Sequence, residues 1–121
     1  MRAPAGSGPE LVPCGSGDII WTDFDPSRGR EQAGRRPALV VSPEAFQAAS
    51  GFAFVCPITS RVRPFGTSVV LPDGLAVAGE VLTSHMRSID TLARPIKVAG
   101  RVPDAVLADV RAKLAALIGL G

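Results

Sequence analysis

The chain has 121 residues and a formal net charge of +2, with 13 Lys and Arg against 11 Asp and Glu. This length fits one domain that buries a core without disulfides or metal, and the small net charge excludes a protein that is basic over its whole surface. Thirteen Gly, eleven Pro, five Phe, one Trp and no Tyr favour a loop-rich β domain with an aliphatic core.

The N-terminal residues 1–16 are small and rich in Gly and Pro, and they lack the apolar run of a secretory signal peptide. We expect a disordered extension there, followed by one domain spanning residues 17–121. Cys14 and Cys56 lack metal-ligand spacing, so both are interpreted as free thiols in a reducing compartment, with Cys56 in the core. No stretch is long enough to cross a bilayer. We therefore expect a cytoplasmic protein with no membrane partner.

The first half of the chain combines strand periodicity with one helical signal. Three segments alternate large side chains or are continuously apolar, as strands are: residues 18–24, 37–42 and 52–59. Residues 43–49 predict a short helix, with Ser42 as its N-cap, Pro43 at its first position and Gly51 as its end. Two loops interrupt this half, at residues 25–36 and 60–66, and both are basic.

The second half predicts three further strands and a closing helix. The strands are expected at residues 67–71, 79–89 and 96–101. Residues 103–118 carry an apolar stripe at spacings of three and four, which predicts an amphipathic helix. This stripe packs either on the sheet or on a second subunit, and the pattern leaves both open. Local patterns alone thus predict a small, mainly β barrel with two short helical insertions and a C-terminal helix.

Arginine is concentrated in one loop, where four of these residues fall within nine positions: Arg28, Arg30, Arg35 and Arg36. Composition alone favours a solvated loop. The alternative is phosphate binding, because a guanidinium offers a fixed charge and a bidentate fork. RNA can be cleaved by its own 2′-hydroxyl if a protein supplies positive charge, a hydroxyl donor and a proton acceptor, and Glu31 is the nearest carboxylate that could accept the proton.

Other catalytic equipment is missing from the sequence. There is no phosphate-cradling Gly-Lys motif, no paired Cys, no His-rich metal set and no Gly-x-Ser-x-Gly elbow. His85 is the only histidine, which excludes a pair of catalytic histidines within one chain. A structural or minor binding role is favoured for it over catalysis.

The segment GDIIWTDFDPSRGREQAGRRPALVVSP, residues 17–43, resembles the opening of the MazF/PemK/Kid family of toxin endoribonucleases. The shared signature is Gly-Asp-apolar-apolar-Trp, then Asp-Pro, then Gly-x-Glu-Gln-x-Gly-x-Arg-Pro and an apolar strand. Residues 57–60 are similar to the family's Pro-x-Thr-Ser segment, and residues 81–90 to the segment before its last strand. The resemblance covers about residues 16–119.

The resemblance implies an SH3-like twisted β-barrel of the CcdB/MazF type, working as a homodimer. It implies sequence-specific cleavage of single-stranded RNA without metal or cofactor, leaving a 2′,3′-cyclic phosphate and a 5′-hydroxyl, and so inhibition of translation and growth. It also implies an antitoxin partner whose acidic, disordered tail lies across the substrate groove.

Carried over by position, the resemblance implies that Arg36 acts at the scissile phosphate together with Thr59, and that Glu31 is a third candidate catalytic residue. The alternatives are a structural ion pair for Arg36, a backbone-bonded hydroxyl for Thr59 and a loop-shaping acceptor for Glu31. The expected RNA-binding residues surround these three: Arg28, Arg30, Gln32, Ser60, Arg61, Ser84 and His85.

This chain departs from the family pattern at two places. Arg30 stands where some relatives have histidine, and Ser84-His85 stands where many have Asp/Glu-Gln. Relatives that assign the acid–base work to an Arg-x-Asp pair would have it at Leu82 and Ser84. Neither residue can do this work, so that version of the mechanism is excluded and the version that uses Arg36 and Thr59 is favoured. We expect Ser84-His85 to alter base preference, with His85 stacking on or hydrogen-bonding a base.

Two other functions compete with RNA cleavage. One is a protein-binding toxin of the same fold, like the CcdB relatives that poison a topoisomerase, although those relatives generally lack the Glu-Gln-x-Gly-x-Arg-Pro loop. The other is a non-catalytic SH3-like binding module, against which the retention of Arg36 and Thr59 weighs.

Overall fold

The computed structural model describes residues 11–24, 35–64 and 66–120. The expectations for residues 1–10 and for the loop residues Arg28, Arg30, Glu31 and Gln32 lie outside the described residues.

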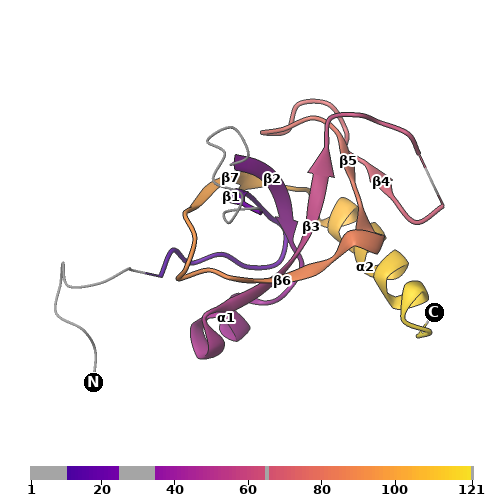
Figure 1. Ribbon diagram of the computed structural model, residues 1–121. Coiled ribbons are helices and arrows are strands. Elements are labelled where there is room, and N and C mark those ends of the chain that lie inside the picture. Colours follow the sequence, from indigo (N-terminus) through magenta and orange to yellow (C-terminus); the bar gives the residue numbers. More distant parts are fainter. Residues whose placement is uncertain (1–10, 25–34, 65, 121) are drawn as a thin grey trace, which may run out of the picture.

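The described residues form a seven-stranded antiparallel sheet in the order β4-β5-β3-β2-β1-β7, with β6 pairing β3 beside β5 (Figure 1). The strands are β1 (Asp18–Asp23), β2 (Arg35–Val40), β3 (Phe52–Thr59), β4 (Val69–Val70), β5 (Glu80–Val81), β6 (Arg87–Asp90) and β7 (Ile96–Arg101). The pairing order has two ends, at β4 and β7, so the predicted barrel is open in this part of the chain. The mainly β prediction with two short helical insertions and a closing helix is confirmed.

Within the described residues three helical segments join or follow the strands: α1 (Glu44–Ser50), the 3₁₀ turn η3 (Thr83–His85) and α2 (Asp104–Leu117). Gly51 ends α1 with a φ of 81°, as predicted, because glycine tolerates the left-handed conformation. Ser42 is not the N-cap. Pro43 holds that position, and the Ser42 hydroxyl instead accepts the Phe54 backbone N–H at 3.0 Å.

The predicted strand at residues 79–89 is wrong as one element. Its two ends both pair with β3, but the β3–β6 register is offset from the β3–β5 register by three residues. The three residues of η3 take up this offset. Sequence periodicity cannot show such a break, because each half alternates correctly on its own. The predicted strand at residues 67–71 is also shorter, since only Val69 and Val70 pair with β5.

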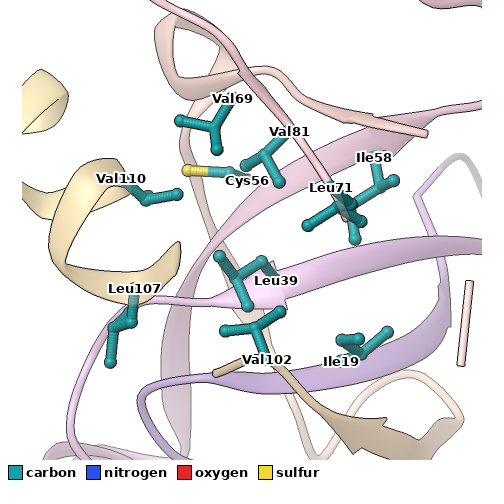
Figure 2. Close-up of a cluster of buried hydrophobic side chains, with 10 residues drawn as sticks. All are labelled: Ile19, Leu39, Cys56, Ile58, Val69, Leu71, Val81, Val102, Leu107 and Val110. Carbon is teal, nitrogen blue, oxygen red and sulfur yellow. The ribbon is translucent and has the colours of Figure 1, made fainter. Parts of the chain in front are cut away.

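Apolar side chains cover both faces of the sheet. Figure 2 shows the first cluster, in which Leu107 and Val110 of α2 lie over Leu39, Cys56 and Val102. The second cluster contains alternate residues of β1, β2 and β3 together with Cys14 and the β6 residue Ile89: Cys14, Ile20, Ala38, Val40, Ala53, Val55 and Ile89. The alternation predicted for residues 52–59 is therefore confirmed, and β2 and β3 are buried on both faces over residues 38–40 and 55–56.

The α2 stripe packs on the sheet as far as Leu114, which is partly buried against the first cluster. Leu107 and Val110 are buried, whereas Leu117 and Ile118 at the far end are 43% and 67% exposed. No helix among the described residues could cross a membrane.

The segment before β1 is anchored by Gln47, a fully buried residue of α1. The Gln47 side chain accepts the Cys14 N–H at 2.9 Å and donates to the Val12 carbonyl at 2.8 Å and to the Thr91 hydroxyl at 3.1 Å. Residues 12–14, which the sequence places in the extension, thus pack against the domain.

Both cysteines are buried free thiols, so we expect them to react slowly in the native protein. Burial raises the pKa of Cys14 to about 11, with Asp18 and Glu44 adding to the effect, and raises the pKa of Cys56 to about 12. The thiolate is the reactive form, and it is scarce below these values. At pH 8.5 an aromatic disulfide reagent should label the native protein far more slowly than the protein in guanidinium. Rapid native labelling of both thiols would contradict this packing.

Candidate active site

An open groove of about 590 Å³ lies where β2 starts and β3 ends. Its lining comes from four parts of the chain: Trp21; Arg35, Arg36 and Pro37; Pro57, Ile58, Thr59 and Ser60; and Ala76, Val77, Ala78 and Leu82. Consecutive residues of a strand point to opposite faces of the sheet. Because consecutive residues of β2 and of β3 line the groove, it runs across the strand ends rather than over one face.

The pairing of β2 with β3 brings Arg36 and Thr59 together. The register pairs Ala38 with Pro57 and Leu39 with Cys56. Continuing it by two residues places Arg36 opposite Thr59, and both residues line the groove. Side chains directly opposite one another on neighbouring strands share a face, with Cβ atoms about 5 Å apart. The two residues predicted from separate sequence segments therefore lie on one wall.

The Arg36 side chain is exposed and lines the groove. Among the described residues neither Arg35 nor Arg36 makes an ion pair. The structural ion pair considered for Arg36 thus has no partner in this part of the chain. A guanidinium at the rim of a groove offers an anion several parallel N–H donors.

Thr59 makes the backbone hydrogen bond that was considered as the alternative to a catalytic role. Its Oγ1 accepts the Arg61 backbone N–H at 3.1 Å, which shapes the loop that follows β3. A hydroxyl that accepts one hydrogen bond still has its own O–H to donate. The Thr59 side chain is therefore held in place while its proton remains available to a bound anion.

Glu80 supports the same loop from the neighbouring strand. It lies opposite Thr59 in the β3–β5 register and is only 1% exposed. Its carboxylate accepts the Arg63 backbone N–H at 2.7 Å and the Ser68 hydroxyl. Thr59 and Glu80 together thus hold the backbone amides of two alternate residues in the loop after β3.

Gly79 lets β5 approach Thr59 this closely. Its φ is +142°, and a Cβ atom there would overlap the carbonyl oxygen of Thr59. Any side chain at this position would push against the backbone that carries the Thr59 hydroxyl.

The remaining predicted residues divide into two groups. Ser60 lines the groove as expected. Arg61, Ser84 and His85 are exposed but are not part of the lining, although Leu82, which accepts the His85 backbone N–H at 3.1 Å, is. No group of three His, Cys, Asp or Glu in residues 11–24, 35–64 and 66–120 could hold a metal ion.

The sequence did not identify Glu80, Trp21 or residues 76–78 as parts of the site. One signal for Glu80 was available: it is an acidic residue within a predicted strand, next to apolar residues. Buried carboxylates need partners, so such a residue indicates a local hydrogen-bond network. Nothing local marks residues 76–78.

The site combines cations, a hydroxyl donor and an indole around an open groove, which suits an anionic, base-containing polymer. Residues 16–118 match the family model of the PemK-like, MazF-like toxin of type II toxin–antitoxin systems. The chain belongs to the MazF/PemK toxin family. This assignment confirms the resemblance seen in the loop signature.

Two curated relatives in the MazF/PemK family are named as endoribonucleases. The endoribonuclease toxin MazF of Escherichia coli K12 is 39% identical over 103 residues, which cover 85% of this chain and 92% of that protein. The endoribonuclease PemK of Escherichia coli is 35% identical over 106 residues, covering 84% and 80% respectively.

Solved MazF structures share the fold. MazF from Deinococcus radiodurans has a TM-score of 0.80 and 42% identity, covering 89% of this chain and 98% of that one. A MazE–MazF complex from the same organism has a TM-score of 0.80 and 38% sequence identity, covering 91% of this chain and 99% of that one. The MazF-type architecture expected from the sequence is thereby confirmed.

Replacing Glu80 by Ala should lower the free energy of unfolding by about 1–3 kcal/mol, because the Ser68 hydroxyl and the Arg63 N–H lose a buried acceptor. Glu80→Gln keeps an acceptor and should cost less. Urea unfolding followed by circular dichroism measures both changes. The exposed α2 residue Arg111 provides the control, and Arg111→Ala should stay within about 0.5 kcal/mol of wild type. Equal stability of Glu80→Ala and wild type would contradict the buried clamp.

Proposed function

We propose that this protein is the toxin of a toxin–antitoxin pair and cleaves single-stranded RNA at a short sequence, without metal or cofactor. The observation that carries the proposal is the Arg36–Thr59 wall of the groove, found in a member of a family whose curated relatives are named endoribonucleases. Cleavage of messenger RNA inhibits translation and growth.

The proposed reaction is attack by a ribose 2′-hydroxyl on the adjacent phosphorus. The O2′–P bond forms and the P–O5′ bond breaks, which leaves a 2′,3′-cyclic phosphate and a 5′-hydroxyl. The O2′ proton leaves to a base, and the departing O5′ takes a proton. Glu31, the candidate base, lies outside the described residues.

In the proposed reaction, Arg36 and Thr59 stabilise the negative charge that develops on the phosphate oxygens during this step. The exposed guanidinium faces the groove and can donate two parallel hydrogen bonds to the non-bridging oxygens. The Thr59 hydroxyl can donate a further one, since the Arg61 N–H occupies only an acceptor position on its oxygen. Preformed donors act most strongly where charge develops, because they need no reorganisation during the reaction.

The same groove suits the protein partner. The comparison structures include MazE–MazF complexes, and we infer that an antitoxin with an acidic, disordered tail occupies the groove of this chain and competes with RNA for Arg35 and Arg36. We also infer that the protein works as a homodimer in the cytoplasm, to which the exposed apolar end of α2 could contribute an interface.

The test is cleavage of a long single-stranded RNA in EDTA, with the 5′ ends mapped. Wild type should give discrete cuts with 5′-hydroxyl ends. Arg36→Ala and Thr59→Ala should each slow cleavage by about 10²–10³-fold, which is typical for the loss of one donor to a developing oxyanion. Arg111→Ala should retain the wild-type rate.

Absence of cleavage by wild type on any RNA would overturn the proposal and leave the CcdB-like topoisomerase poison or a non-catalytic module. Unchanged cuts in both variants would keep the endoribonuclease and discard this site.

A further inference from the structure

A second hollow continues the groove on the far side of Trp21. It measures about 240 Å³ and is lined by Trp21, Arg35 and Lys97. Trp21 and Arg35 also line the main groove, so the two hollows meet at these side chains. Lys97 does not line the main groove. Trp21 and Arg35 therefore connect the main groove with the hollow that contains Lys97.

The pairing of three strands fixes this arrangement. Trp21 of β1 lies opposite Pro37 of β2 on one side and opposite Lys97 of β7 on the other. Arg35 is two residues before Pro37 on the same strand, so all four side chains share one face of the sheet. The Trp21 side chain is half-buried, so part of its indole remains accessible to solvent.

The two cationic side chains beside the indole are exposed. Within the described residues neither Arg35 nor Lys97 forms an ion pair, although Asp23 lies opposite Arg35 in the β1–β2 register. A half-buried indole that lies between two exposed cationic side chains matches the alternation of base and phosphate along a single strand of RNA. Acidic peptide side chains would use the cations but would have no need of an aromatic face.

We propose that Trp21, Arg35 and Lys97 form a subsite for one nucleotide outside the cleaved step of a single-stranded RNA. Trp21 stacks on the base, and Arg35 and Lys97 contact the flanking phosphates. This proposal rests on the proposed function, since it assumes that the main groove holds the scissile phosphate. Stacking on an aromatic side chain tolerates any base. The subsite thus sets how much RNA the protein needs rather than which bases it selects.

The first experiment compares RNAs of different length. After one cut site has been mapped, two series of oligonucleotides carry the same cleaved word and are shortened by single nucleotides from the 5′ or the 3′ side. Wild type should lose roughly five- to a hundredfold in kcat/KM when one particular flanking nucleotide is removed, and a similar amount when that nucleotide is made abasic.

The variants then assign this loss to the three residues. Trp21→Ala should bring the ratio of kcat/KM for the longer RNA to kcat/KM for the shorter RNA close to one. Trp21→Phe should retain most of the wild-type ratio. Lys97→Ala should weaken binding of the longer RNA and reduce the slope of log K against log salt by about one. Arg111→Ala, which removes one exposed charge elsewhere, should leave the length ratio and the salt slope at their wild-type values.

Fluorescence gives a readout that does not depend on cleavage. Trp21 is the only tryptophan in the chain, so the wild-type emission reports on this indole alone. An RNA carrying a 2′-deoxy sugar at the cleaved step lacks the attacking hydroxyl and remains intact. Its binding should quench the emission, and the abasic version should quench markedly less.

The outcomes separate the subsite from the function. If wild type cleaves no RNA, the proposed function fails and the subsite with it. If wild type cleaves but Trp21→Ala and Lys97→Ala leave the length ratio unchanged, the function stands and the subsite is wrong. Quenching by an acidic peptide, with none by the 2′-deoxy RNA, would overturn the subsite and assign this hollow to a protein partner.

Discussion

The pairing of β2 with β3 is the constraint on which the site depends. Both strands are buried on both faces over residues 38–40 and 55–56, so the Ala38–Pro57 and Leu39–Cys56 pairs fix the register against slippage. A shift by one residue would move Leu39 and Cys56 to the wrong apolar cluster and would separate Arg36 from Thr59. The two proposed catalytic side chains are thus aligned by the backbone ladder and by the burial of apolar residues two and three positions away.

Polar groups act at the next level, in the loop that follows β3. Thr59 and Glu80 each accept a backbone amide from this loop, and the close approach of Gly79 keeps β5 against Thr59. The loop carries Ser60 into the groove and Arg61 to its outside. A buried carboxylate is costly unless its hydrogen bonds are satisfied, and here the loop backbone and Ser68 satisfy them. Stability of the loop and geometry of the site therefore share the same few groups.

The sequence predicted most of this arrangement, and its failures have physical causes. Alternation identified residues 52–59, whose two faces enter the two apolar clusters, and the apolar stripe identified the closing helix. Residues 79–89 were misjudged because the three-residue offset against β3 is a property of two strands. Arg36 and Thr59 came from motif resemblance, whereas Lys97 could not be connected with Trp21 until β7 was paired with β1. The wall formed by β2 and β3 likewise depends on contacts that no local pattern encodes.

The central claim is that Arg36 and Thr59 act on one phosphate from one wall. A double-mutant cycle on the single-turnover cleavage rate of a defined RNA tests it most directly, using Arg36→Ala, Thr59→Ala and the double variant. We expect strong non-additivity, with the double variant little slower than the slower single variant, because residues that stabilise the same charge act as a unit. If the two losses multiply fully, the two residues act independently and the account of a shared phosphate is contradicted.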